Sequence, residues 1–200
     1  MRLSRAYDLF VQEQRINQHT DATLEFYKYS AGKFVDYCGD VSCDTVQEMV
    51  PDYFEGLREK VKPVSVHTYW RGIRTFCRWL HSEGYATPIK LPSIRCPETA
   101  VRPLPAPKIS QLLRHFKPDS FTGLRNQAIV RLFYDTGIRL KELSQLDLGN
   151  VDLEEGLALV QGKGKKERWV PIGRKTRKML WRYIKQRARY SGAEQALFIT

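Results

Sequence analysis

Two short stretches, TGIRLKELSQL (residues 136–146) and QGKGKKERWVPIG (residues 161–173), decide how this chain is interpreted. The first predicts a short amphipathic helix that is entered through Gly137 and that begins with an arginine. The second closes a pattern typical of a β-hairpin, because two short apolar runs, 157–161 and 168–172, flank a lysine-rich tip that contains glycine. An arginine at the start of a helix, followed closely by a basic hairpin, favours a site for a phosphate group.

The composition limits the class of protein. Two hundred residues, of which 42% are hydrophobic, suit one large domain or two small ones, each with its own core. The chain has no run of about eighteen apolar residues, and its first fifteen residues are too charged for a signal peptide, so we expect a cytoplasmic protein without a membrane segment. Its cysteines form no C-x-x-C pair and have no adjacent histidine cluster, which favours free thiols and no metal site. These cysteines are Cys38, Cys43, Cys77 and Cys96.

The net charge of +11 is concentrated in one part of the chain. Residues 1–90 contain 12 basic and 12 acidic residues, whereas residues 91–200 contain 21 basic and 10 acidic ones. Within the neutral part, residues 61–90 have five basic residues and a single acid, Glu83. This distribution is consistent with a polyanionic partner, although a generally basic soluble protein would also show it.

A proline-rich stretch divides the chain. Residues 88–107 contain six prolines and no hydrophobic periodicity, which is typical of an extended linker. We therefore expect one domain over residues 1–87 and another over residues 108–200.

The first domain is predicted to be a bundle of four helices. Ser4 is a candidate N-cap for the first helix, and Thr20 or Asp21 for the second. Thr45 and Glu48 match a capping box for the third helix. On the second helix one apolar face is expected, formed by Leu24, Tyr27, Ala31, Phe34 and Cys38.

The fourth helix, residues 65–84, carries two stripes at three- and four-residue spacing. The apolar stripe consists of Val66, Trp70, Ile73, Cys77 and Leu80. The basic stripe consists of His67, Arg71, Arg74 and Arg78. A solvated surface is the simpler explanation of the basic stripe. However, such a surface normally mixes charges of both signs, so we favour contact with the DNA backbone or a groove.

The second domain is predicted to mix helices with a small antiparallel sheet. Helices are expected over 109–118, 123–137, 138–146 and 174–190, and the hairpin strands lie between the last two. The segment ALFIT (196–200) has the pattern of a strand or of an extended segment. Inward-facing positions are expected at Ala128, Leu132, Ile138, Leu143, Leu146, Met179, Leu180, Tyr183 and Ile184.

The order of these pieces resembles the tyrosine recombinases, the phage-integrase and Xer-type family. The stretch 136–173 contains a T-G-x-R-x-x-E-L helix entry and then a G-K-G-x-K-E-R-x-V-P hairpin. Upstream, TLEFYKYSAGKFVDYC (23–38) and the helix 65–84 resemble the family's SAM-like four-helix core-binding domain. The resemblance implies a mainly α fold: this domain, then the first part of a mixed α/β catalytic domain.

The resemblance also implies roles for individual residues. Arg139 matches the first arginine of the family's catalytic set, Lys163 matches the hairpin lysine, and Glu142 matches an acidic position that supports the site. A guanidinium can bind two non-bridging phosphate oxygens, and a hairpin ammonium can protonate a leaving oxygen. Without the resemblance, a surface ion pair and a flexible lysine would be the simpler explanations. Further DNA contacts are expected from Lys165, Lys166 and Arg168.

The family's reaction is DNA strand cleavage and rejoining through a 3′-phosphotyrosyl intermediate, in site-specific recombination or integration. It needs no cofactor and no metal, in agreement with the absence of a phosphate-binding glycine loop and of a metal-ligand cluster from the sequence. The implied partners are double-stranded DNA and further recombinase protomers in a synaptic assembly.

The chain departs from the family pattern near its end. No H-x-x-R motif follows the hairpin, and Tyr183 lies on the apolar face of its helix, so we interpret it as a core residue. We therefore expect a catalytically incomplete part of a recombinase, without the nucleophile. The alternatives are a non-catalytic DNA-binding module derived from an integrase and, less favoured, a helical transcription factor.

Overall fold

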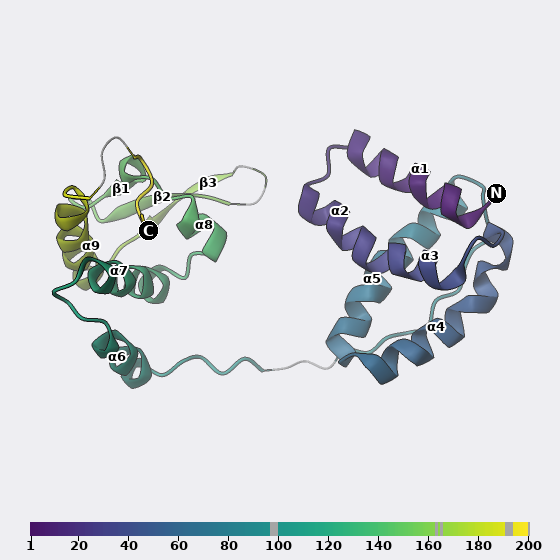
Figure 1. Ribbon diagram of the computed structural model, residues 1–200, viewed down its shortest axis with the longest axis horizontal. Helices are drawn as coiled ribbons and strands as arrows, with labels where there is room; N and C mark the ends of the chain where they lie inside the picture. The colour runs from purple at the N-terminus through teal and green to yellow at the C-terminus, as the bar shows by residue number, and fades with distance from the viewer. Residues whose placement is uncertain (97–99, 163, 165, 191–193, 200) are drawn as a thin grey trace. The chain divides into compact units, whose positions relative to one another are not determined.

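The computed structural model describes residues 1–96, 100–162, 164, 166–190 and 194–199 (Figure 1). The chain divides into two compact units, residues 1–101 and 102–200, and this division falls inside the proline-rich stretch. The described residues are mainly helical and include one three-stranded antiparallel sheet, which confirms the predicted fold class. None of their helices combines the length and the apolar character that crossing a membrane requires.

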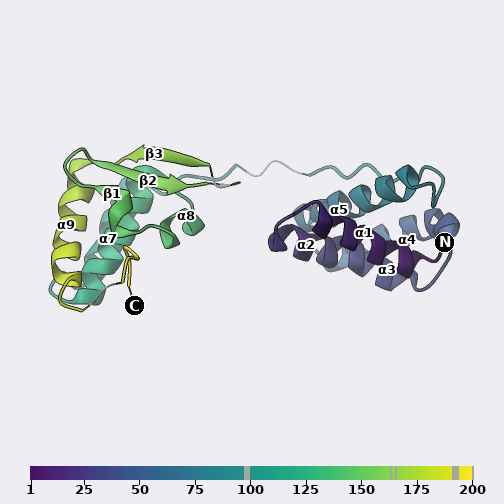
Figure 2. The same ribbon diagram turned by 90° about the horizontal axis from the view of Figure 1, so that it is seen from above.

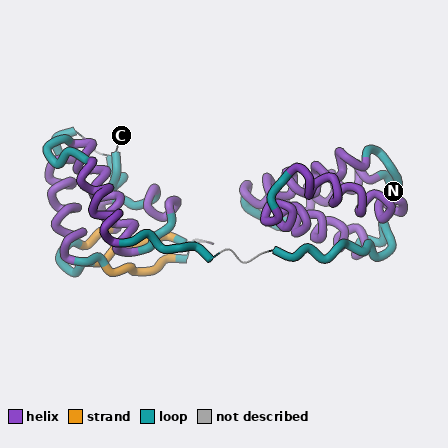
Figure 3. The backbone as a smooth tube through the Cα atoms, turned by 90° about the horizontal axis from the view of Figure 1, so that it is seen from below, coloured by secondary structure: helices purple, strands orange, loops and turns teal. Residues whose placement is uncertain are grey.

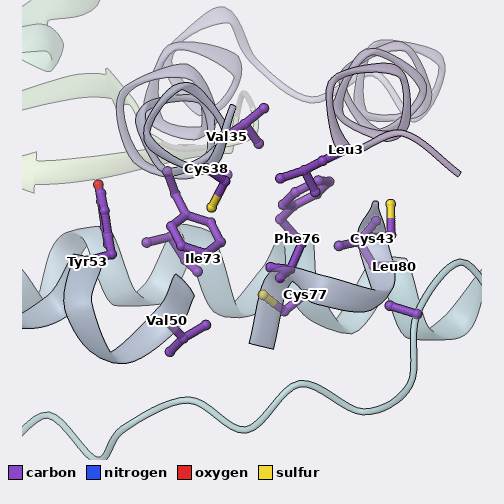
Figure 4. Close-up of a cluster of buried hydrophobic side chains, with 14 of the residues drawn as sticks. Leu3, Val35, Cys38, Cys43, Val50, Tyr53, Ile73, Phe76, Cys77 and Leu80 are labelled. Carbon is purple, nitrogen blue, oxygen red and sulfur yellow. The ribbon is translucent and has the colours of Figure 1, made fainter. Parts of the chain in front are cut away.

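Within residues 1–96, the first unit contains four helical segments, as predicted. The first segment is α1 (Leu3–Ile16). The second is a continuous run of α2 (Asp21–Tyr27), the π-helical turn η1 (Lys28–Gly32) and α3 (Lys33–Cys38). The third is α4 (Val46–Lys60), preceded by the 3-10 turn η2 (Cys43–Thr45), and the fourth is α5 (Pro63–Ser82). Figure 4 shows Ile73, Phe76 and Leu80 of α5 among the apolar side chains that the other helices contribute. The apolar stripe of α5 is buried as predicted, except that Trp70 is only partly covered.

Two predicted caps of this unit are wrong. Ser4 lies inside α1, because the amide of Leu3 donates to the Val41 carbonyl (2.9 Å) and the helix starts there. Thr45 does precede α4, but its hydroxyl donates to the Ser42 carbonyl (3.0 Å) and caps nothing. The 3-10 turn gives Thr45 a ψ of −4°, whereas a capping side chain needs an extended backbone.

The close crossing of α5 and η1 depends on a glycine. A Cβ added to Gly72 would lie 1.8 Å from Ser30 Oγ and 2.5 Å from Ser30 Cβ. The Ser30 hydroxyl donates to the Phe26 carbonyl (2.6 Å), so it cannot swing aside without losing that bond. Only glycine fits at position 72 of this helix pair.

Over its described residues, the second unit contains four α-helices, one 3-10 turn and three strands. They are α6 (Ala106–His115), α7 (Phe121–Thr136), α8 (Leu140–Ser144), η3 (Leu148–Asn150, a 3-10 turn), β1 (Val151–Asp152), β2 (Leu157–Gln161), β3 (Glu167–Pro171) and α9 (Arg174–Arg187). Helices α7 and α9 pack side by side, and the sheet lies on one side of the pair (Figure 2 and Figure 3). Residues predicted to face inward, including Leu132, Ile138, Leu180 and Tyr183, are buried in one core.

The predicted hairpin is present, with a small shift. Strand β2 begins and ends where it was predicted, whereas β3 starts at Glu167 instead of Arg168. The antiparallel register places Val160 opposite Arg168 and Gln161 opposite Glu167. Strand β1 was not predicted, since two residues are too few to show an alternating pattern.

The segment 194–199 makes an isolated bridge, between Asp147 and Ala196, and bends at Leu197 and Phe198. Its backbone is held largely by groups from other elements. Two backbone bonds join it to the residues around Leu146: the Leu197 amide donates to the Leu146 carbonyl, and the Leu148 amide donates to the Gln195 carbonyl. Two arginine side chains bind its carbonyls: Arg187 donates to those of Glu194 and Ala196, and Arg125 donates to that of Ile199. The Ile199 amide donates to the Tyr183 hydroxyl. The strand predicted for residues 196–200 is not assigned over the described residues 196–199, where Ala196 makes only an isolated bridge.

Candidate functional site

The turn between α7 and α8 determines where Arg139 points. Helix α7 ends at Gly137, whose φ of 63° lies in the left-handed region and whose amide donates to Phe133 O (2.9 Å). The next residue, Ile138, is buried in the core and anchors the turn. Arg139 then has an extended backbone and precedes the first residue of α8. Because Ile138 points inward, the Arg139 side chain points outward and is 74% exposed.

Glu142 holds Arg139 in two ways. Its Oε2 accepts from the Arg139 amide (2.9 Å) and its Oε1 accepts from Arg139 Nη1 (2.9 Å). The Arg139 amide would otherwise be an unpaired donor at the start of α8, so the carboxylate caps the helix and fixes the guanidinium together. The sequence predicted this pair from its three-residue spacing, but it did not predict that the Glu142 side chain would be only 3% exposed.

A second arginine reaches the same carboxylate from the sheet. Nη1 of Arg168, on β3, donates to Glu142 Oε1 (2.8 Å), and Nη2 donates to Oε2 (2.9 Å). This is a bidentate pair between groups 26 residues apart in the sequence. The hydrogen bonds from Arg168 and from the Arg139 amide lower the pKa of the Glu142 carboxyl to about 2. The carboxylate therefore stays charged while it is almost fully buried.

We call Arg139, Glu142 and Arg168 the arginine–glutamate trio. Sequence reasoning had placed Arg168 among the DNA contacts, yet in the structure both of its terminal nitrogens bind Glu142. The Arg168 side chain is 45% exposed, compared with 74% for Arg139. Arg139 gives one terminal nitrogen to Glu142 and keeps the larger exposed surface, so it is the trio's better-placed group for an outside anion.

The hairpin begins beside this trio. A Cβ on Gly162 would lie 3.4 Å from Arg168 Nη1 and 3.7 Å from Glu142 Oε1, so the end of β2 is in van der Waals range of both. The Gly162 amide donates to the Lys166 carbonyl (2.7 Å), and Lys166 is exposed. The predicted catalytic Lys163 and the predicted DNA contact Lys165 lie outside the described residues.

The predicted basic stripe of α5 forms one surface of the first unit. Arg71 and Arg78 are exposed, and Arg74 is partly covered because its guanidinium lies over the Trp70 ring, 4.9 Å from the centroid. His67 stacks on the same ring at 5.6 Å. Over the part of the chain that the structure describes, no carboxylate comes within 4.0 Å of these arginines. Their charges are therefore uncompensated locally.

Sequence reasoning missed two features of this surface. Trp70 was assigned to the apolar stripe alone, although it stands between His67 and Arg74 at three- and four-residue spacing and supports both. His81 was not considered, yet with Arg74 and Arg78 it lines a groove of about 460 Å³ between α5 and the segment 88–93. The position of His81, three residues after Arg78, was the available signal.

Comparison with known proteins places these features in a family. The sequence model of the phage integrase family matches residues 103–200. The chain is 30% identical to tyrosine recombinase XerC of Pseudomonas syringae pv. syringae (strain B728a), an alignment that covers 98% of this chain and 67% of that protein. The chain belongs to the phage integrase family of tyrosine recombinases. It is also 31% identical to tyrosine recombinase XerC of Pseudomonas putida (strain F1), over 94% of this chain. It spans 64% of the length of that relative.

Solved structures of tyrosine recombinases share the fold of this family member. A lambda integrase tetramer bound to a Holliday junction superposes with a TM-score of 0.75 at 14% identity, covering 100% of this chain and 60% of that one. The Tn1549 transposon integrase in complex with transposon right end DNA also gives a TM-score of 0.75 at 14% identity, covering 100% and 71%. At these identities the likeness concerns the fold alone.

Tyr183 of this family member is a core residue, as predicted. Its side chain is 0% exposed, its hydroxyl accepts the Ile199 amide (3.2 Å), and its ring stacks on Phe198 at 5.4 Å. Burial raises the pKa of the phenol above its ordinary value, which makes the phenolate less accessible. A hydroxyl in this position is unsuited to attack an external phosphate.

Proposed function

We propose that this chain is part of a site-specific tyrosine recombinase. It would bind double-stranded DNA and contribute to strand cleavage and rejoining through a 3′-phosphotyrosyl intermediate. Membership of the family supports this reaction class. The observation that carries the proposal is the exposed Arg139 guanidinium, held in place by a buried carboxylate that Arg168 also binds.

Arg139 is proposed to stabilise charge on the phosphate under attack. The non-bridging oxygens gain negative charge in the transition state, and a guanidinium fixed beforehand needs no reorganisation at that moment. The two hydrogen bonds from Arg139 to Glu142 hold the guanidinium in place before a phosphate binds. The trio carries two positive charges and one negative charge, so a net positive charge remains for the phosphate.

Lys163 is proposed to protonate the leaving 5′-oxygen from the hairpin tip. The support from the described residues is indirect, since Gly162, one residue earlier in the chain, lies in contact range of the trio. A long side chain that ends in an ammonium and follows Gly162 directly has the reach that proton transfer to a bound phosphodiester requires.

The basic surface of α5 is proposed to bind the DNA backbone. Arginines without a local carboxylate can release counterions from DNA and give salt-dependent affinity. Further protomers are proposed as partners as well, because a related lambda integrase is a tetramer on a Holliday junction and another structure of it is a dimer on a COC′ core site.

The nucleophilic tyrosine is proposed to lie outside residues 1–200. This rests on the burial of Tyr183 and on the absence of an H-x-x-R motif after the hairpin. Tyr190 is exposed, but it lies before the point at which the family's H-x-x-R motif is expected. The same burial favours a second candidate function, a DNA-binding module without catalysis. The two differ in whether the chain, joined to a segment that supplies H-x-x-R and a tyrosine, forms a covalent link to DNA.

Adduct formation on nicked duplex DNA tests this proposal. We expect residues 1–200 to bind the duplex but to form no denaturant-resistant adduct, because in-line attack requires a positioned nucleophile. The chain extended by the recombinase segment should form the adduct, and Arg139→Ala in the extended chain should abolish it. An adduct of residues 1–200 that maps to Tyr183 or Tyr190 would disprove the assignment of the nucleophile. An extended chain that binds DNA without reacting would favour the non-catalytic module.

A further inference from the structure

Arg168 does not behave like a residue that reaches for DNA. Its two terminal nitrogens both donate to Glu142, at 2.8 and 2.9 Å, and β3 fixes its backbone opposite Val160. A guanidinium that donates two parallel hydrogen bonds to a carboxylate can no longer use the same pair of N–H groups to bind a phosphate. Its role must therefore be sought in what it does to Glu142.

Without Arg168, Glu142 would weaken the site that it builds. A buried carboxylate whose partner is Arg139 alone forms an ion pair with no net charge. The negative charge of the carboxylate would then oppose the attraction between Arg139 and an approaching phosphate. With Arg168 bound, the carboxylate is compensated from the sheet side. The net positive charge of the trio then falls to Arg139, the more exposed of the two arginines.

Arg168 also connects two elements that approach the site separately. Glu142 belongs to α8, which follows the Gly137 turn, whereas Arg168 belongs to the hairpin strand β3. The two parallel bonds link helix and hairpin at the point where Gly162 begins the basic tip. A change in the position of the hairpin would therefore be transmitted through Glu142 to the Arg139 side chain.

We propose that Arg168 is a positioning residue that neutralises Glu142 and couples the hairpin to Arg139, and that it is not itself a DNA contact. This inference rests on the proposed function, because it gives Arg139 the role of anion ligand. It predicts that any effect of Arg168 on the Kd for DNA depends on the presence of Arg139.

A double-mutant cycle on DNA affinity tests this prediction. The Kd for a fluorescein-labelled duplex is measured by anisotropy for the parent chain, Arg139→Gln, Arg168→Gln and the double variant. Each single change should weaken binding about tenfold, the size of one charge-assisted hydrogen bond, and the double variant should bind little more weakly than either alone. Additive effects that together reach about a hundredfold would mean that Arg168 binds DNA directly, and would overturn the proposal.

Two further variants separate positioning from charge and from folding. Arg168→Lys keeps the charge but cannot donate two parallel bonds, so it should restore only part of the affinity. Full restoration would show that charge alone matters and would contradict the positioning role. Arg182→Gln removes an exposed arginine of α9 and is the matched control, which should bind DNA within about twofold of the parent chain.

A measurement without DNA keeps this inference separate from the proposed function. The guanidinium Nε–H resonance of Arg139 is recorded by NMR in the parent chain, in Arg168→Gln and in Arg182→Gln. Under the proposal it shifts and broadens in Arg168→Gln alone, because Glu142 is released from the hairpin. An unchanged resonance in Arg168→Gln overturns the positioning role. A parent chain that fails to bind DNA overturns the proposed function but leaves the NMR result to decide the role of Arg168.

Discussion

The two basic regions of this chain hold their arginines by different means. On α5, Arg74 lies over the Trp70 ring and no described carboxylate is near, so the guanidinium keeps all its N–H donors. In the trio, Arg139 gives donors to Glu142 and receives a defined direction in return. An aromatic platform limits where a cation lies without using its hydrogen bonds, whereas a carboxylate fixes its direction but offsets some of its charge. The first arrangement suits binding along any stretch of phosphates, and the second suits one phosphate in one orientation.

Removing the carboxylate should have the largest effect on this contrast. Glu142→Ala deletes four hydrogen bonds to a buried group and leaves two arginines without their common partner. We expect the free energy of unfolding of the second unit to fall by about 3 kcal/mol, at the lower end for a buried pair because both arginines can be hydrated. Urea unfolding, followed by hydrogen exchange of the β2 and β3 amides, measures it.

Glu155→Ala, an exposed carboxylate of the same unit, is the control and should change stability by less than about 0.5 kcal/mol. The pH dependence should agree. Because the pKa of Glu142 is about 2 in the folded chain against an ordinary 4.5, its contribution is complete above about pH 4.5 and is lost as the pH falls towards 2. If parent chain and Glu142→Gln differ in stability by the same amount throughout that pH window, the carboxylate charge is not what stabilises the trio.

Removing the cations of α5 should have the next largest effect, and on binding instead of stability. Arg71→Ala, Arg74→Ala and Arg78→Ala together should weaken DNA binding about a hundredfold at moderate salt. They should also reduce the salt slope by about 0.9 for each phosphate that the variant no longer neutralises. Fluorescence anisotropy over a series of salt concentrations gives both values.

A matched triple variant at exposed basic positions elsewhere in the same unit controls for net charge. It combines Arg5→Ala, Arg15→Ala and Lys60→Ala. If this control weakens binding as much as the α5 variant does, affinity follows total charge and the α5 surface has no special role.

The aromatic platform itself should have the smallest effect. Trp70→Leu keeps an apolar side chain but removes the ring under Arg74 and beside His67. We expect DNA affinity to fall two- to fourfold, about 0.5–1 kcal/mol, the usual size of an exposed cation–π interaction. If Trp70→Leu leaves affinity unchanged while Arg74→Ala lowers it, the ring does not orient Arg74, and the two basic regions differ less than we propose.

Local patterns in the sequence were sufficient for most of the fold. The stripe from Val66 to Leu80 predicted α5, and the apolar runs around the glycine-containing tip predicted β2 and β3 to within one residue. Arg139 and Glu142 were predicted to share a face because three residues separate them on a helix. All these features depend on neighbours within one element or on a single turn.

Features that depend on distant residues could not be predicted. Arg168 pairs with Glu142 across 26 residues, and only the register of the sheet brings them together. The cap expected at Ser4 failed because strand-like pairing with residues 41–42 starts α1 two residues earlier, at Leu3. The π-helical turn η1 contains Ser30, which packs against Gly72 of another helix, so the local sequence does not predict the turn. Competition between local propensity and tertiary packing decided each case.

The way in which the segment 194–199 is held has a consequence for sequence variation. Arg125, Arg187 and Tyr183 bind its carbonyls and an amide, groups that every residue type except proline provides alike. Glu194 and Gln195 point into solvent and make no demand of their own, whereas Leu197 and Ile199 fill the core. Substitutions at Glu194 and Gln195 should therefore leave the path of the chain unchanged. The path of this segment is therefore determined mainly by the side chains of Arg125, Arg187 and Tyr183, which bind its backbone.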